Sequence, residues 1–170
     1  GKSYLLKLLR NHQIETGAAK SKNFFYINFE DERLSGIEAH ELSGVLEIYY
    51  RLYQPDTGKR IVLFFDEIQA VPQWARWVNR LYEQKKYKIF ITGSNASLLK
   101  EETGKLLTGR CIPLEIFPLS FREYWQWAEK RPAPTEKDFY RLETRAAIIN
   151  AFEAYIKSGG FPEHLKTKHH

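Results

Sequence analysis

Two hydrophobic patterns alternate along the first two thirds of the chain. Nearly continuous apolar runs, rich in β-branched and aromatic residues, predict strands buried on both faces. These runs lie at 23–29, 61–67, 88–92 and 111–116. Apolar residues that recur at helical spacing predict one helix before the first run, at 4–10, and one in each of the next two intervals, at 37–53 and 72–84. Strands that alternate with helices in this way are typical of an α/β fold with a mainly parallel sheet.

The last third of the chain has a different pattern, because no further strand is predicted there. A capping box at 120–123 opens a short helix. After a proline-rich break, we expect Thr135 to cap a long helix that continues to about Lys157. Its apolar stripe consists of Phe139, Leu142, Ala146, Ile149, Phe152 and Ile156. The chain therefore divides into a βα core, 1–118, and a helical extension, 119–170.

Two adjacent carboxylates, Asp66 and Glu67, close the central apolar run. In an open parallel α/β sheet, ligands bind just beyond the carboxyl ends of the strands. The two acids therefore stand where a ligand would meet the sheet. Taken alone, the pair is better explained as polar residues where the chain leaves the sheet and enters solvent. The first three residues of the sequence shift the preference towards a ligand site.

The chain begins with Gly1, Lys2 and Ser3, directly before the first predicted helix. This tripeptide is the end of the phosphate-binding loop G-x-x-x-x-G-K-[ST]. Backbone N–H groups at a helix N-terminus attract phosphate, the lysine reaches the β- and γ-phosphates, and the hydroxyl binds Mg²⁺. Gly-Lys-Ser also occurs often by chance, and the strand and first glycine of the motif are not in this sequence.

Polar residues also occur within or after the neighbouring predicted strands. Ser94 and Asn95 follow the run at 88–92, where small and amide side chains can orient a water molecule or hold a phosphate oxygen. They are equally ordinary turn formers. Asn28 lies inside an apolar run, and its amide could either hold Glu67 away from water or face a turn. The sequence leaves these alternatives open.

Composition narrows the class of protein without identifying an activity. The single cysteine, Cys111, excludes an internal disulfide and fits a reducing compartment, so we expect a cytoplasmic protein. No apolar run approaches the roughly 20 residues that span a bilayer, and no membrane partner is expected. The net charge of +5 supports contact with DNA only weakly, because the basic residues are scattered. Methionine is absent and the chain opens within a motif, so we expect the protein to continue upstream.

Six short motifs occur in order along the chain, and together they resemble a known family. They are Gly1-Lys2-Ser3, Phe64-Phe65-Asp66-Glu67-Ile68-Gln69, Ile91-Thr92-Gly93-Ser94-Asn95, Thr108-Gly109-Arg110, Pro118-Leu119-Ser120-Phe121 and Gly159-Gly160-Phe161-Pro162. The set resembles the AAA+-type P-loop ATPases of archaea and bacteria that carry a C-terminal domain of unknown function. The resemblance implies a P-loop NTPase three-layer sandwich. Its central strand ends in Asp66 and lies between the strand of Asn28 and the strand that precedes Asn95.

The resemblance also assigns the residues that would bind nucleotide and metal. Gly1, Lys2 and Ser3 match the end of the Walker A motif, and Asp66 matches the Walker B aspartate. ATP would be held by these residues. Ser3 and Asp66 would hold Mg²⁺, the aspartate through water.

The same resemblance assigns residues to catalysis. Glu67 would polarise the water that attacks the γ-phosphate, since phosphoryl transfer depends mainly on positioning and charge stabilisation. Ser94 or Asn95 matches the sensor-1 position, and Asn95 is preferred. Arg110 lies where an arginine finger from a neighbouring subunit is expected, which implies a homo-oligomer.

The sequence departs from the family at both ends. The first strand of the sheet, which lies in mid-sheet in this family, is missing, and the extension stops where the C-terminal domain would begin. The resemblance implies that residues 119–170 form a lid-like extension leading to that domain. Protein or DNA partners would then bind through the extension and the absent domain.

The resulting expectation is ATP binding with Mg²⁺-dependent hydrolysis by a switch or motor module. The alternative is a nucleotide-gated module that binds protein or DNA with negligible turnover. A P-loop kinase is disfavoured, because Glu67 beside Asp66 suits activation of water and no acceptor-site motif is present.

Overall fold

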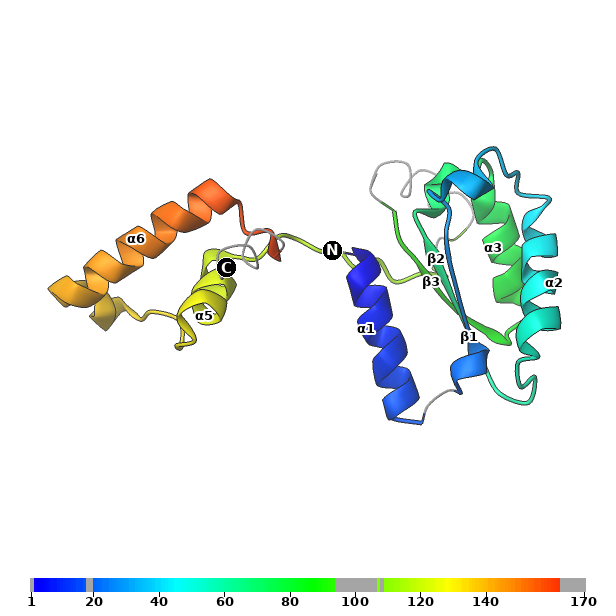
Figure 1. Cartoon of the computed structure of the whole chain (residues 1–170), viewed down its shortest axis with the longest axis horizontal. Coiled ribbons are helices and arrows are strands. Elements are labelled where there is room, and N and C mark those ends of the chain that lie inside the picture. The colour runs from blue at the N-terminus through cyan, green and yellow to red at the C-terminus, as the bar shows by residue number, and fades with distance from the viewer. Residues whose placement is uncertain (1, 18–19, 94–106, 108, 163–170) are drawn as a thin grey trace. The chain divides into compact units, whose positions relative to one another are not determined.

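The computed structural model describes residues 2–17, 20–93, 107 and 109–162 (Figure 1). The chain separates into two compact units, Gly1–Pro113 and Leu114–His170. Each unit has its own buried core and is described by itself below.

The first unit is built on a parallel sheet, as the sequence predicts. Its described strands are β1 (Phe24–Asn28), β2 (Ile61–Asp66) and β3 (Tyr87–Ile91). They lie in the order β1-β2-β3 (Figure 1). The register aligns Asn28 with Asp66 and Phe65 with Ile91. The strand that ends in Asp66 therefore lies between the two strands expected to flank it.

Helices cover both faces of this sheet, which makes three layers. They are α1 (Lys2–Glu15) on one face and α2 (Leu42–Tyr53) and α3 (Trp74–Glu83) on the other (Figure 1). Alternate residues of β2 face opposite layers. Phe64 packs in a cluster with Leu6 of α1, whereas Phe65 packs in the larger cluster with Trp77 of α3. All six residues of β2 are buried, because apolar helices cover both sides.

Three short 3₁₀ helices join these elements. They are η1 (Ser21–Asn23), η2 (Glu32–Leu34) and η3 (Ile68–Ala70). Within the described residues, no helix combines the length and the apolar character that a bilayer crossing requires.

The predicted strand at 111–116 is wrong. This segment has no regular secondary structure, and Ile112 and Leu114 are 96% and 79% exposed. An apolar run becomes a strand only where a neighbouring strand offers partners for its backbone groups. In the described part of the chain, the sheet ends at β3 and this segment pairs with no strand.

The second unit contains the predicted short helix but not the predicted long one. Helix α5 (Phe121–Glu129) begins with the expected capping box between Ser120 and Glu123. Thr135 forms a second capping box, with Asp138, but this opens only the 3₁₀ helix η4 (Glu136–Tyr140). Helix α6 (Leu142–Ser158) begins separately, because Arg141 is extended at φ −91° and ψ 121°. Apolar spacing continues through the break, so the sequence pattern does not reveal it.

The apolar stripe predicted for this last helix does not form the core of the unit. Its largest members are exposed, from Phe152 at 45% to Leu142 at 84%. The buried residues come from the neighbouring face of α6 and from α5, namely Tyr124, Trp125, Ile148 and Ala151. The helix therefore packs one face inward and leaves its longer apolar stripe exposed within this unit.

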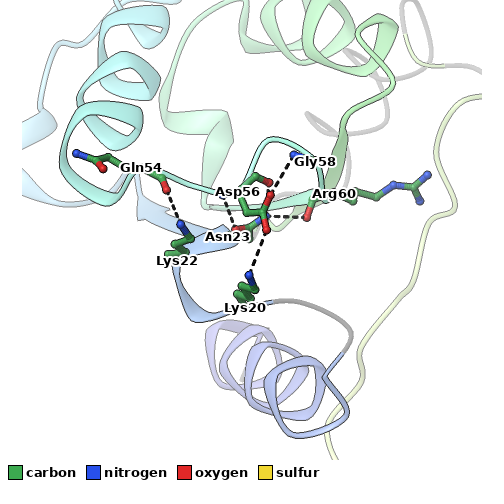
Figure 2. Close-up of polar contacts among 7 residues, drawn as sticks. All are labelled: Lys20, Lys22, Asn23, Gln54, Asp56, Gly58 and Arg60. Atoms are coloured by element: carbon green, nitrogen blue, oxygen red, sulfur yellow. Dashed lines mark hydrogen bonds and ion pairs between the residues drawn. The ribbon is translucent and has the colours of Figure 1, made fainter.

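A buried asparagine joins two loops at the amino ends of β1 and β2 (Figure 2). Asn23 is fully buried. Its Oδ1 accepts a hydrogen bond from the Asp56 N–H at 2.9 Å, and its Nδ2 donates to the Asp56 carbonyl at 3.0 Å. Around it, Lys20 forms an exposed ion pair with Asp56 at 3.3 Å. This arrangement is structural, since it lies at the opposite end of the sheet from Asp66.

Replacing Asn23 with alanine is expected to lower the free energy of unfolding by about 1–3 kcal/mol, because two backbone groups of Asp56 lose their partner in a buried place. Lys20→Ala is the control and should cost less than about 1 kcal/mol, because the ion pair is exposed. Urea denaturation followed by circular dichroism measures both. Equal losses in the two variants would contradict the structural role of Asn23.

Candidate functional site

Asp66 is the centre of a polar cluster at the carboxyl end of the sheet. It is fully buried at the end of β2. Its Oδ2 accepts a hydrogen bond from the Tyr26 hydroxyl at 2.7 Å, and its Oδ1 accepts one from the Thr92 hydroxyl. The Ser3 hydroxyl also lies close enough to lower the pKa of this carboxyl. Hydroxyl groups from β1, from the end of β3 and from the start of α1 therefore converge on one carboxylate.

This environment keeps Asp66 ionised although it is buried. Burial by itself raises the pKa of the carboxyl. The hydroxyl groups of Ser3, Thr92 and Tyr26 and the positive charge of Lys2 act in the opposite direction and outweigh burial. The pKa of Asp66 therefore lies below its ordinary value, and a negative charge is available at neutral pH to hold a cation.

Lys2 brings the first residues of the chain to the same end of the sheet. Its Nζ donates a hydrogen bond of 2.6 Å to the carbonyl oxygen of Gly93, just beyond β3. It is the first residue of α1, and the first turn of that helix contains no acidic residue. The N-terminus of a helix has a partial positive charge and free N–H groups, which together attract anions.

Glu67 follows Asp66 in an unusual backbone conformation. It has φ 51° and ψ 44°, in the left-handed region, which is uncommon for a residue other than glycine. Its N–H donates to the Thr92 hydroxyl at 3.2 Å, and its Oε2 accepts a hydrogen bond from Gln69 Nε2 at 2.6 Å. Such backbone outliers persist where surrounding contacts enforce them, and they concentrate at functional sites.

The structure thus brings Lys2, Ser3 and Asp66 together, with Glu67 adjoining. Three predicted site residues, Gly1, Ser94 and Asn95, lie outside the described residues.

Arg110 does not join the cluster within one chain. Its guanidinium forms an ion pair with Glu83 at 2.9 Å and a hydrogen bond with Asn79. Both partners lie near the C-terminal end of α3. That end of α3 leads into the start of β3, so Arg110 is held away from the carboxyl ends of the strands.

Asn28 faces a turn. Its Oδ1 accepts a hydrogen bond from the Glu30 N–H at 3.0 Å, which is the second of the two alternatives left open by the sequence.

Sequence reasoning missed three polar contributors to the site, which are Tyr26, Thr92 and Gln69. In the sequence, Tyr26 is one of several aromatic residues in a predicted buried strand. Only the strand register shows that its hydroxyl meets Asp66. Thr92 ends the run at 88–92, where a polar residue at a strand end is a weak signal that could have marked it.

The residues of this cluster fit Mg²⁺. The ion prefers oxygen ligands and commonly takes one or two from the protein, with water and substrate phosphates completing its octahedral shell. Ser3 and Asp66 offer a hydroxyl and an ionised carboxylate close to each other. A metal site of another kind, made of three or more His, Cys, Asp or Glu side chains, does not occur among the described residues.

Comparison with known proteins gives a family for this chain. A family model described as an AAA domain matches residues 1–125. The uncharacterized protein MJ1544 of Methanocaldococcus jannaschii is 37% identical over 96% of this chain and 33% of its own length. An uncharacterized protein of Haemophilus influenzae is 32% identical over 95% of this chain and 37% of its own length.

The chain spans about a third of the length of these relatives. No solved structure matches it significantly. The family model covers more than half of the chain and includes α1 and all three described strands, which confirms the family inferred from the sequence motifs. The chain therefore belongs to the AAA domain family, which implies nucleotide binding, and its three-layer parallel α/β unit is consistent with the P-loop NTPase fold.

Proposed function

We propose that this domain binds ATP together with Mg²⁺ and hydrolyses it, as a switch or motor module of a longer protein. The observation that carries the proposal is the convergence of the start of α1 on Asp66. The Ser3 hydroxyl and the charge of Lys2 both lie close enough to that carboxylate to lower its pKa. A lysine, a hydroxyl and an ionised carboxylate at a helix N-terminus are the groups that a metal-bound triphosphate requires.

Each group of the cluster has a defined task in this proposal. Lys2 binds the β- and γ-phosphates after giving up its hydrogen bond to the Gly93 carbonyl. Ser3 and Asp66 hold Mg²⁺, which when bound neutralises phosphate charge. Glu67 accepts a proton from the attacking water, and its position at the end of β2, next to Asp66, supports this role. Asn95, or Ser94, would hold that water or the γ-phosphate.

The proposal includes a homo-oligomer in which Arg110 acts on the nucleotide of a neighbouring copy. Within its own chain, Arg110 pairs with Glu83 near the C-terminal end of α3 and is 40% exposed. A role in hydrolysis would therefore need a second copy. An arginine supplied in this way is worth about 10³–10⁵ in rate.

A second candidate function is a nucleotide-gated module that binds a protein or DNA with negligible turnover. The exposed apolar stripe of α6, with Leu142 at 84% and Ile156 at 63%, favours a protein partner over DNA. If Lys2→Ala and Glu67→Gln proteins both bound the partner as the wild type does, a nucleotide-independent scaffold would be favoured instead.

Replacing Lys2 with alanine tests the proposed function directly. Loss of a hydrogen-bonded charge on the phosphates is expected to weaken binding of MgATP by about 10- to 100-fold, as hydrogen bonds to charged groups are worth about 1.5–3 kcal/mol. Isothermal titration calorimetry on the full-length protein measures the affinity.

Lys7→Ala is the matched control, because Lys7 lies on the same helix and is exposed. It should leave the affinity unchanged. A wild-type protein that does not bind MgATP, or a Lys2→Ala protein that binds it equally well, would contradict the proposal.

A further inference from the structure

We propose that Tyr26 is a positioning residue for Asp66, and that its hydroxyl holds the carboxylate in the orientation needed to bind Mg²⁺. This inference rests on the proposed function of the same site. It concerns a residue that lies in none of the motifs by which the site is found from the sequence. The evidence is the contact geometry of the two side chains and of the groups around them.

The strand register explains how Tyr26 reaches Asp66. Tyr26 is paired with Phe64, and Asp66 lies two residues further along β2 on the same face of the sheet. Two residues of a strand span about 6–7 Å. A tyrosine side chain that leans along the strand covers this distance, and its hydroxyl meets Asp66 Oδ2 at 2.7 Å. Phenylalanine would fill the same space without the hydrogen bond.

The second carboxylate oxygen is held from the opposite neighbouring strand. The Thr92 hydroxyl, just after β3, donates to Asp66 Oδ1. It also accepts a hydrogen bond from the Glu67 N–H, so its own proton is directed to the aspartate. Each oxygen of Asp66 therefore has a donor from a different strand. A carboxylate held at both oxygens is more strongly restrained against rotation than one held at a single oxygen.

Tyr26 acts as a donor at every physiological pH. Burial, the hydrogen bond to Asp66 and the negative charge of Asp66 together raise the pKa of the Tyr26 phenol to about 12. The phenol therefore stays protonated, and it stabilises the ionised form of Asp66. The benefit is mutual, because hydrogen bonding to Tyr26 also contributes to the lowered pKa of Asp66.

Exposure of the residue argues against a role in packing alone. Tyr26 is 40% exposed, whereas Phe24 and Phe64, its neighbours in the α1-facing layer, are 7% and 1% exposed. The buried layer on this face is thus made by other residues. The Tyr26 hydroxyl is directed at Asp66, the one buried carboxylate among the described residues.

Tyr26→Phe tests the inference by removing one oxygen atom and keeping the ring. The readout is Mn²⁺ binding, measured by electron paramagnetic resonance on the full-length protein with a non-hydrolysable ATP analogue. We expect affinity for Mn²⁺ to fall about tenfold, while affinity for the analogue without metal stays unchanged.

Tyr49→Phe is the matched control. The Tyr49 hydroxyl donates an equally short hydrogen bond of 2.7 Å, but to the backbone carbonyl of Lys22 at the other end of the sheet. Its loss should leave Mn²⁺ affinity as in the wild type. Thermal melting of both variants reports any general loss of stability, which should be similar in the two.

The outcomes separate this inference from the function on which it rests. If the wild-type protein binds no metal with the nucleotide analogue, the proposed function fails and the inference falls with it. If the wild type binds Mn²⁺ and Tyr26→Phe binds it equally well, the inference alone is overturned. A tenfold loss that Tyr49→Phe shares would also overturn it, because the cause would then be general stability.

Discussion

Replacing Glu67 with glutamine is expected to lower the rate of ATP hydrolysis by about 10²–10⁴-fold, which is the usual contribution of a general base. Glutamine has nearly the same shape but cannot accept the proton of the attacking water. The local structure should survive, because the backbone hydrogen bond from residue 67 to Thr92 is kept and an amide oxygen can still accept from Gln69. Binding of ATP should therefore remain close to that of the wild type.

The measurement is phosphate release by the full-length protein at saturating MgATP, with affinity determined separately by calorimetry. Glu47→Gln is the control, since Glu47 is exposed on α2. The Glu47→Gln protein should hydrolyse ATP at the wild-type rate. A Glu67→Gln protein that keeps its rate would remove Glu67 from catalysis. Loss of both binding and hydrolysis would instead point to a damaged fold.

Phe65→Ala is expected to lower the free energy of unfolding of the first unit by about 3–5 kcal/mol, as truncation of a buried phenylalanine usually does. Phe65 is fully buried in the middle strand. Its ring centroid lies 4.9 Å from that of Trp77 and 6.1 Å from that of Phe29. Because helices and sheet are fixed around it, the cavity left by the ring cannot close easily.

Urea denaturation followed by circular dichroism measures this loss. Ile48→Ala provides a comparison, because Ile48 is 53% exposed on α2 and its truncation should cost far less. Phe65 also precedes Asp66 and Glu67, so an activity measurement on the folded variant shows whether the core sets the position of the site. Equal effects of the two substitutions on stability would contradict the central place of Phe65 in the core.

Most of the fold could be predicted because its signals are local. The described strands coincide with apolar runs at 23–29, 61–67 and 88–92, and the capping box at Ser120 marks the start of α5. The two errors have a common origin. A strand at 111–116 needs a neighbouring strand to pair with, and the break at Arg141 depends on how η4 and α6 pack. Neither requirement can be recognised from the spacing of apolar residues within the segment itself.

Part of the candidate site could be found in the same way. Lys2, Ser3 and Asp66 were expected to meet because the carboxyl ends of parallel strands and the N-terminus of the following helix share one end of the sheet. The contacts of Lys2 and Ser3 agree with this expectation. The catalytic roles given to Glu67 and Asn95, and the action of Arg110 on a neighbouring copy, stay predictions.

The sequence by itself determined the three described strands of the first unit and the polar residues that end them, because nearly continuous apolar runs mark strands that are covered on both faces. Only the tertiary structure decided that Tyr26 and Thr92 hold the two oxygens of Asp66 and that Arg110 pairs with Glu83. These contacts join residues more than 25 positions apart, and they depend on strand order and register. Order and register are set by packing among distant segments, so they are not contained in any local pattern of the chain.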